Sequence, residues 1–590
     1  SQLATGPQPA LALAADLVEQ RPDEQQVVYV FSDFREDPWS NPTRLEEPLQ
    51  RLKDQGVTVN LVRCVDEQRP NLAITRLEPS PGTLAAGVPL FVDVEVKNFG
   101  REPAEHVLVD FHTVFHDDEL TESPSSPSLS REELPKLDID RIAPGESVVR
   151  RVQVYFPKAG QHAVAAELPA DPVAADNRRW CVIQLPAAVP VLVIDGDTQQ
   201  RNAEFLVSAF RPGRTVETGI RPDVQPESFL RDSTDETLNA YRSIFLLDVG
   251  RLDDLAVSNL RRYVESGGGV SFFLGPHSSI EFLRELHDDG KGLFPQPIDR
   301  MDLLQPNTTD SPDLQVESHP LFEVLAGEQN AYLRSILVRQ YFRTRRDWIP
   351  PADSTVNILA RLRNGQPLVV ERHWGEGRVM ALSTTLAPDW NNWATQPTFV
   401  VFMLELQAYL QRPNDASTLR LVGNPIELQL DAANVTPEVI CSLPALSGLD
   451  DGPRREVRKT LQDVSSAEAA LTKVTLGEAR SAVGEDTNLA GIYEFWTRTV
   501  EGNLHVDRYA LNVDTRESDL ALVAAPALAD RLPEDQVAIF AANEGSFGTS
   551  DDDRYSWSHF LMYAVAAMLV GEQLLAYSAS YHAGAKGGRS

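Results

Sequence analysis

The stretch VPVLVIDGD, residues 189–197, is a continuous apolar run that ends in a polar turn, Asp195-Gly196-Asp197. The runs YRSIFLLDVG (241–250) and VSFFLG (270–275) have the same form, and each precedes a segment with helical apolar spacing. Strands that are apolar on both faces and alternate with helices are typical of a parallel sheet covered by helices. In such a sheet, ligands bind at the loops that follow the carboxyl ends of the strands. The sequence therefore predicts an α/β domain over residues 187–413.

The order of these elements resembles the class I glutamine-amidotransferase-like domain, whose flavodoxin-like fold is shared with the DJ-1/PfpI superfamily. The resemblance rests on VPVLVIDGD, YRSIFLLDVG, LRRYVESGGGVSFFLG and GQPLVVERHWGEGRVMALSTTLAPDWNNW. In the active families, a nucleophilic cysteine occupies the strand-to-helix turn after the glycine-rich strand. Here that turn reads Gly275-Pro276-His277-Ser278-Ser279, and the three cysteines, Cys64, Cys181 and Cys441, lie outside the domain. The resemblance implies the fold, and the missing cysteine predicts that the domain is not an enzyme.

An alternative is a hydrolase or amidotransferase that acts at the Gly275–Ser279 turn through His277 or Ser278. A working serine needs a histidine base and an orienting acid within hydrogen-bonding reach. The Gly-x-Ser-x-Gly elbow of many serine hydrolases is absent from this turn. We therefore expect no catalytic residue here.

Two further motifs of the domain have both a functional and a structural interpretation. Glu371, His373 and Glu376 match the His/Glu partners of amidotransferases, but their sequence predicts two strands joined by a hairpin at Gly375-Glu376-Gly377. The glycines of residues 267–269 end a helix and lead into a strand, whereas a phosphate loop lies between a strand and the following helix. Both motifs are expected to be structural, and no cofactor is predicted.

The composition limits the possible partners. The chain has 590 residues, with 54 Lys and Arg against 86 Asp and Glu, and a formal net charge of −32. Such a surface repels nucleic acid, so nucleic acid is not an expected partner. Three widely spaced cysteines make neither a disulfide framework nor a zinc site. The length and the hydrophobic content of 42% predict several domains.

Residues 1–70 resemble the C-terminal half of a von Willebrand factor A (vWA) domain. In complete vWA domains an Asp-x-Ser-x-Ser loop, a threonine and a further aspartate bind a divalent metal. Asp33 matches the late aspartate and Thr5 the threonine, but the Asp-x-Ser-x-Ser element is missing from this chain. Hard cations bind about six oxygen ligands. Asp33 and Thr5 are therefore weak candidates, and no metal is predicted.

Residues 71–186 alternate apolar and polar positions between turn signals, which predicts an antiparallel β-sandwich. The segment resembles the Ig-like CARDB modules found beside vWA domains in bacterial surface proteins. His106, His112 and His116 lie among acidic residues, but they lack a second ligand pair at fixed spacing. They are expected to be surface histidines of the sandwich.

The remaining residues predict a second β-rich domain over 414–518, a linker over 519–553, a transmembrane helix over 554–578 and a cytoplasmic tail over 579–590. Trp557–Tyr577 is long enough to span a bilayer and has aromatic flanks. Its uninterrupted apolar core, Phe560–Gly571, would equally fit a docking helix. The architecture resembles membrane-anchored vWA proteins of the bacterial aerotolerance (Bat-like) type, which implies that most of the chain lies outside the cytoplasm.

These expectations combine into a non-enzymatic, membrane-anchored interaction or scaffold protein. Its partners would be other proteins, in particular other membrane-anchored subunits. The hydrolase or amidotransferase of the DJ-1/PfpI superfamily is the alternative. A metal-dependent adhesion receptor is a third possibility, and it would require the missing first half of the vWA domain.

Overall fold

The structure is a computed structural model. The chain divides into two compact units. One unit contains Arg69–Leu520, and the other combines Gly6–Gln68 with the segment that begins at Ala521. The residues that the structure describes are 6–20, 26–39, 42–116, 129–197, 199, 201–213, 217–307, 311–325, 331–346, 348–411, 420–431, 433–445, 454–460, 462–463, 471–477, 487–523, 537–542 and 552–580.

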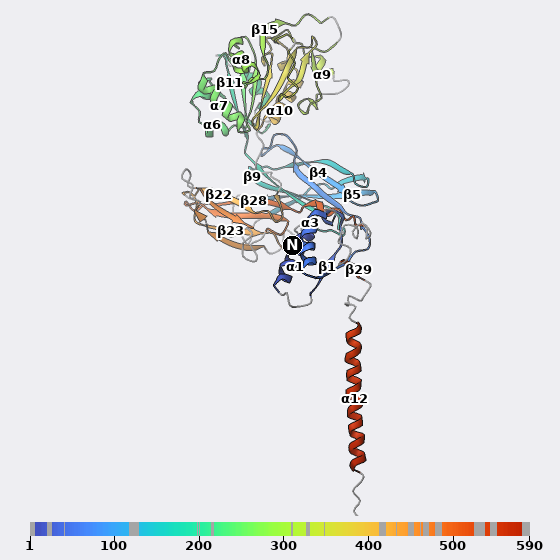
Figure 1. Cartoon of the computed structure of the whole chain (residues 1–590). Helices are drawn as coiled ribbons and strands as arrows, with labels where there is room; N and C mark the ends of the chain where they lie inside the picture. Colours follow the sequence, from blue (N-terminus) through green and yellow to red (C-terminus); the bar gives the residue numbers. More distant parts are fainter. Residues whose placement is uncertain are drawn as a thin grey trace, which may run out of the picture. The chain divides into compact units, whose positions relative to one another are not determined.

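The larger unit contains the predicted α/β domain, built on an eight-stranded sheet in the order β12-β11-β13-β14-β20-β19-β18-β16 (Figure 1). The five strands from β12 to β20 run parallel, and the other three pair antiparallel. The strands are β11 (Val189–Asp195), β12 (Ile220–Gln225), β13 (Ser243–Leu247), β14 (Gly269–Phe273), β16 (Leu314–Val316), β18 (Val356–Leu362), β19 (Pro367–Trp374) and β20 (Gly377–Leu382). The prediction that the three apolar runs form neighbouring parallel strands is confirmed.

Helices cover both faces of this sheet because each central strand places apolar side chains on both faces. Val191 and Val193 of β11 pack with α4 and α10, whereas Leu192 and Ile194 pack with α5, α6, α7 and α8. The helices are α4 (Arg201–Phe210), α5 (Ser228–Asp232), α6 (Asp235–Asn239), α7 (Asp254–Glu265), α8 (Ile280–His287), α9 (Ala331–Arg334) and α10 (Pro397–Leu410). Burial of each large apolar side chain contributes about 1.5–3 kcal/mol, so these two clusters hold the domain together.

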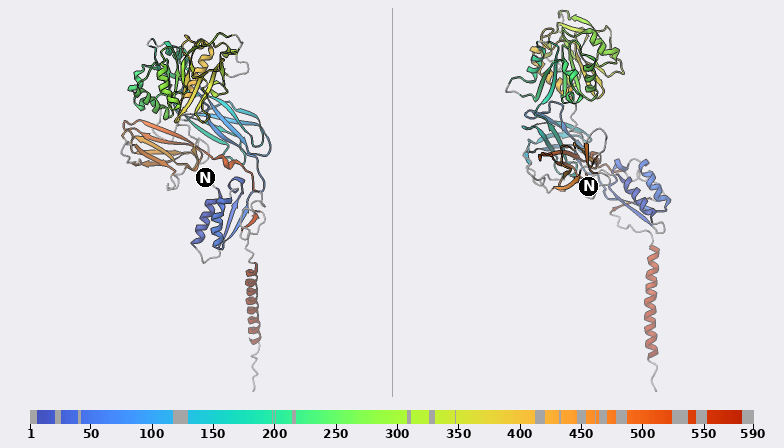
Figure 2. Two further views of the ribbon diagram at one scale, coloured as in Figure 1. Left: turned by 45° about the horizontal axis from the view of Figure 1, so that its top comes forward. Right: turned by 90° about the vertical axis from the view of Figure 1, so that its left-hand side faces the viewer.

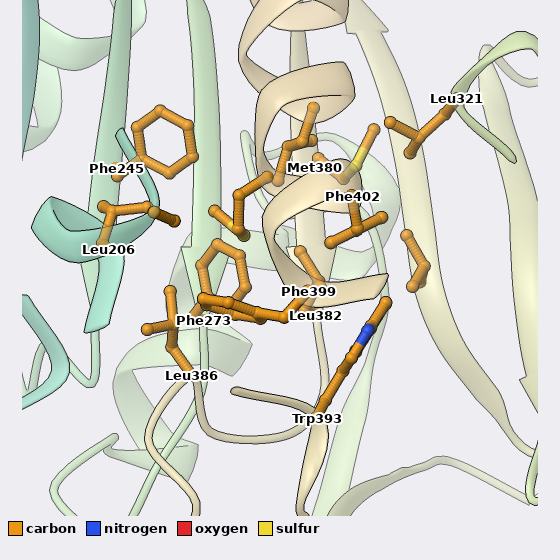
Figure 3. Close-up of a cluster of buried hydrophobic side chains, with 14 of the residues drawn as sticks. Leu206, Phe245, Phe273, Leu321, Met380, Leu382, Leu386, Trp393, Phe399 and Phe402 are labelled. Atoms are coloured by element: carbon orange, nitrogen blue, oxygen red, sulfur yellow. The ribbon is translucent and has the colours of Figure 1, made fainter. Parts of the chain in front are cut away.

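Figure 3 shows part of the first cluster, where side chains of neighbouring strands contact α10. Phe402 of α10 is fully buried and stacks on Phe322, with ring centroids 5.6 Å apart. The ring centroid of Trp393 lies 4.4 Å from that of Phe402. The smaller elements of the domain are β15 (Ile298–Leu303) with its antiparallel partner β17 (Gln340–Thr344), and the 3₁₀ turns η1 (Asp288–Gly290), η2 (Pro320–Phe322) and η3 (Trp393–Thr395).

Residues 71–186 form the predicted antiparallel sandwich. Its sheets are β3-β4-β8 and β10-β9-β5-β6, with β7 paired to β5, and their inner faces share one core. The strands are β3 (Leu72–Pro79), β4 (Pro89–Asn98), β5 (Ala104–His116), β6 (Leu129–Glu133), β7 (Leu137–Ile142), β8 (Ser147–Tyr155), β9 (Gly160–Glu167) and β10 (Arg178–Leu185).

A second β-domain follows the α/β domain and shares a core with the outer face of the first sandwich. Its sheets are β21-β28-β27-β23-β24 and β22-β26-β25. Trp180 and Val114 of the first sandwich belong to the same buried cluster as Tyr493 and Phe495 of the second. The strands are β21 (Arg420–Leu421), β22 (Ile426–Asp431), β23 (Glu438–Leu443), β24 (Arg455–Thr460), β25 (Gln462–Asp463), β26 (Leu471–Leu476), β27 (Gly491–Arg498) and β28 (Leu504–Asn512), followed by η5 (Thr515–Ser518).

The smaller unit contains a three-stranded parallel sheet that joins distant parts of the sequence. Strand β2 (Thr58–Arg63) pairs with β1 (Val27–Ser32) on one side and with β29 (Val537–Ala541) on the other (Figure 2). The helices are α1 (Pro7–Glu19), α2 (Glu36–Trp39) and α3 (Pro42–Asp54). Residues 519–553 were predicted to be a linker, and within them Val537–Ala541 forms β29, which pairs with β2.

The predicted membrane anchor is also wrong. Residues 552–580 do form a helix, α12 (Asp552–Ser580). However, in the described part of the chain no helix reaches the combined length and apolar content that a membrane span requires. Gly571-Glu572-Gln573 interrupts the apolar run of α12. This finding overturns the prediction of a membrane span over 554–578 with the bulk of the chain outside the cytoplasm. Residues 581–590 of the expected cytoplasmic tail lie outside the described residues.

Candidate functional site

The candidate site lies where the chain order of the central sheet reverses. From β11 the chain passes to β12 on one side of the strand and then to β13 on the other. Loops that leave neighbouring strands in opposite directions open a crevice at their carboxyl ends, where open α/β sheets bind ligands. Asp195 ends β11, Asp248 follows β13, and the Gly275–Ser279 turn follows β14. The topology therefore brings the three turns together.

Asp248 is the centre of this arrangement. Its Oδ2 accepts a hydrogen bond from His277 Nδ1 at 2.7 Å. Its Oδ1 accepts from the backbone N–H groups of His277 and Ser278, at 2.9 and 3.1 Å, and from the Ser278 hydroxyl at 3.2 Å. The backbone of Asp248 is left-handed, with φ of 49°. Burial raises the pKa of the Asp248 carboxyl, and its hydrogen bonds with His277 oppose that shift.

Two glycines allow the three turns to approach this closely. A Cβ atom on Gly275 would lie 2.5 Å from Asp248 Cγ, and one on Gly196 would lie 2.2 Å from the Asp248 carbonyl oxygen. Neither distance is compatible with a side chain, so both positions require glycine for close approach rather than for an unusual φ.

His277 presents an oriented imidazole. Its side chain is 53% exposed, and the hydrogen bond to Asp248 is the main cause that raises its pKa, with the charge of Asp197 adding to it. Because Nδ1 bonds the carboxylate, the neutral ring carries its proton there and leaves the Nε2 lone pair available. Asp197 accepts hydrogen bonds from Gln199 N–H at 3.0 Å and from Arg201 Nε at 2.9 Å, which lower its pKa.

Ser278 is not positioned as a nucleophile. Its side chain is buried, and its Oγ accepts a hydrogen bond from Gly275 N–H at 3.0 Å while donating to Asp248. The imidazole of the adjacent His277 bonds Asp248 rather than this hydroxyl. Ser279 caps α8 by accepting from Phe282 N–H at 3.3 Å. Both serine hydroxyls are therefore engaged in hydrogen bonds, Ser278 within the turn and to Asp248, and Ser279 at the start of α8.

The second candidate group lies at the opposite ends of the strands, beside the amino end of β14. In the β14-β20-β19 register, His373 pairs with Arg378, which pairs with Gly269 at the start of β14. Strand β14 ends at Phe273, about 13 Å from Gly269 at ~3.3 Å per residue, and the Gly275–Ser279 turn follows that end. The fold therefore does not bring His373 to the turn, and the hairpin predicted at residues 375–377 is confirmed.

Glu371 of this second group is held in a buried network. Tyr409 donates to its Oε1 at 2.6 Å, and His319 Nε2 lies 3.8 Å from its Oε2. Arg378 covers the Tyr409 ring at 4.2 Å. Burial is the first cause that raises the pKa of Tyr409, and the bond to Glu371 adds to it. This network connects the strand to α10 and η2.

The other sequence candidates are distributed over the molecule. Cys181 and Cys441 are buried in the β-domains, and burial raises the pKa of Cys181 to about 12. Cys64 is exposed in the smaller unit. Asp33 forms an ion pair with Arg35 at 2.5 Å, and Thr5 lies outside the described residues.

The surface location predicted for His112 is wrong. This side chain is buried, because it shares the strand face with Val114, which the second β-domain covers. His106 is exposed as predicted. The side chain of His116 lies outside the described residues.

Sequence reasoning missed Asp248 as the residue that organises the site. The signal was present, because an Asp directly follows the buried run that ends at Leu247, as Asp195 ends the run before it. What the sequence did not give is the left-handed backbone that turns this carboxylate toward the His277 turn.

No protein-family model matches the chain, and no curated protein matches it. Among solved structures, a cytoplasmic protein from Salmonella typhimurium is 16% identical, with 38% of this chain and all of that chain covered, at a TM-score of 0.28. A ThuA-like protein from Bacteroides uniformis is 15% identical over 41% of this chain and 93% of its own, at 0.25. The CARDB domain of a Pyrococcus furiosus protein is 12% identical over 20% and 99%, at 0.15. Similarity at this level carries no argument about function.

Proposed function

We propose that the chain is a non-enzymatic interaction protein whose α/β domain uses its strand-end site as a binding surface. The observation that carries the proposal is the arrangement around Asp248. His277 Nδ1 and the Ser278 hydroxyl both bond this carboxylate, so the turn holds no activated serine. A nucleophilic serine needs the imidazole as its own hydrogen-bond partner. The expected partners are other proteins, and the net charge of −32 disfavours nucleic acid.

The turn has the properties of a preorganised contact rather than of a mobile loop. Four hydrogen bonds converge on Asp248, and two glycines remove the space in which the turn could shift. The His277 ring is exposed, and it offers Nε2 as one oriented polar contact. Rigid presentation lowers the entropic cost of binding.

The test has a chemical arm and a binding arm. A fluorophosphonate probe should leave Ser278 unlabelled by mass spectrometry, and purified chain should show no glutaminase or esterase turnover above background. A photo-crosslinking residue at position 277 should yield a discrete protein adduct in cells. The same residue at position 265, where α7 ends before the amino end of β14, is the control. Labelling of Ser278, or turnover that Ser278→Ala removes, would contradict the proposal.

One observation favours a second candidate, a hydrolase that uses His277 as general base toward water. The buried Asp248 orients the ring and leaves Nε2 free, which is how acid–base pairs are built in many enzymes. This candidate predicts hydrolysis that His277→Ala abolishes and Ser278→Ala leaves nearly unchanged. The two variants therefore separate the candidates.

A further inference from the structure

The first sandwich carries a cluster of metal-ligating side chains on its surface, far along the sequence from the strand-end site. Strands β5 and β7 are antiparallel neighbours, with Glu105 opposite Arg141 and Val107 opposite Ile139. His106 therefore lies opposite Asp140. Asp138 is two residues from Asp140 and projects on the same face, because side chains alternate along a strand. The pairing of β5 with β7 therefore places the three residues near one another.

The side chains converge as the register requires. One ligand atom from each of His106, Asp138 and Asp140 lies within 4.8 Å of the other two. His106 Nδ1 is 3.6 Å from Asp138 Oδ2. Two ligands bound about 2.0–2.2 Å from one zinc ion lie up to ~4 Å apart, so small side-chain rotations would place all three around an ion. His106 and Asp138 are 78% and 50% exposed, which gives an ion direct access.

We propose that His106, Asp138 and Asp140 bind a divalent transition metal, and that Zn²⁺ is the ion that fits this donor set. An imidazole nitrogen selects Zn²⁺ and its neighbours over Ca²⁺ and Mg²⁺, which take oxygen ligands. Two carboxylates balance the charge of the ion. Three protein ligands leave a coordination position for water, as in zinc sites that are not purely structural.

A simple surface ion pair would not account for this arrangement. An exposed His–Asp pair contributes little and needs no third ligand. His505 and Asp507 form such a pair, with 3.4 Å between Nε2 and Oδ1. Within the described ranges, the His106 group is the one set of three or more His, Cys, Asp or Glu residues whose ligand atoms converge. The His505 pair is therefore the matched control.

The test uses the tag-free full chain after treatment with EDTA. Titration with Zn²⁺ in a calorimeter should give one saturable site, and Co²⁺ should give visible d–d absorption. His106→Ala should weaken Zn²⁺ binding by at least about tenfold and remove the Co²⁺ bands, since even the loss of an outer-shell partner costs 10–100-fold. Asp138→Asn and Asp140→Asn should each weaken binding. His505→Ala should bind as the parent does.

Three results would overturn the inference. They are no saturable Zn²⁺ binding, binding that His106→Ala leaves unchanged, and Ca²⁺ competing with Zn²⁺ at equal concentration. His106 has a left-handed backbone, with φ of 51°, so its substitution can alter the strand itself. If the metal-free His106→Ala chain melts differently from the parent, Asp138→Asn decides, because it keeps the shape of the side chain and the backbone.

Discussion

Asp248 controls the protonation of His277. An Asp248→Asn substitution should lower the pKa of His277, because the hydrogen bond to the carboxylate is the main cause that raises it. Asparagine tolerates the left-handed backbone of this position, so the turn should remain folded. The rate of diethylpyrocarbonate modification of His277, followed by mass spectrometry across pH, measures this pKa.

His505 serves as the internal control in the same experiment, because Asp507 and not Asp248 raises its pKa. The raised pKa of His277 also predicts a direction for stability. The pairing of His277 with Asp248 stabilises the fold fully at pH values below the pKa that His277 has in the unfolded chain. This contribution is lost as pH rises through the pKa of His277 in the folded chain. An unchanged modification profile in Asp248→Asn would show that the carboxylate does not set the charge of the ring.

Asp176 should make the larger unit less stable at neutral pH than in mild acid. Burial raises its pKa from 3.8 to about 6, although Asn71 donates to Oδ2 at 2.9 Å. Between these values the folded state binds more protons than the unfolded one, so the unfolding free energy falls as pH rises. Asp176→Asn should therefore stabilise the unit by about 2–3 kcal/mol at pH 8 and by much less at pH 4.5.

The neighbouring Asp171 provides a control of opposite sign. It accepts hydrogen bonds from Leu72 N–H, Val173 N–H and the Asn177 amide. Asp171→Asn should lower the melting temperature of the unit at pH 8, because an amide cannot accept all three bonds. Equal effects of the two substitutions would refute the burial argument for Asp176.

Helix α10 covers one face of the central sheet. Phe402→Ala should destabilise the larger unit by about 3–5 kcal/mol, because the ring is fully buried between Phe322 and Trp393. Val400→Ala on the same helix removes a side chain that is 38% exposed and should cost less than about 1 kcal/mol. Urea unfolding of the two variants compares these values, and similar losses would show that the helix is not anchored through Phe402.

Elements whose burial is visible in their own apolar pattern could be predicted from the sequence. Contacts with segments that are distant in the sequence could not. The parallel strands could be predicted because Val191 to Ile194 place apolar side chains on both faces of the sheet. Both faces must then be covered by other elements. The burial of His112 was not readable, since it depends on a second domain that packs from several hundred residues away. The separation of His373 from the Gly275–Ser279 turn follows from strand register, which a list of matching residues does not contain.

Strand β29, which pairs with β2, is predicted to be essential to the smaller unit. Ile539 of β29 packs against the core that includes Leu61 and Val59 of β2. Ile539→Asp should place a charge at this edge and lower the melting transition of the smaller unit, while the transition of Arg69–Leu520 stays unchanged. Differential scanning calorimetry distinguishes the transitions. Equal shifts of both would indicate that the two units unfold together.

The pairing of β2 with β29 also fixes an order of events during synthesis. Arg69–Leu520 can fold as soon as it has left the ribosome, since its contacts are made within itself. Strand β2 must wait until residue 541 has been translated. Throughout that interval, β2 exposes an unpaired parallel edge, the kind of surface that joins other chains. A truncated messenger RNA that does not encode β29 should therefore yield a product in which Arg69–Leu520 is correctly folded. That product should aggregate through its amino-terminal segment.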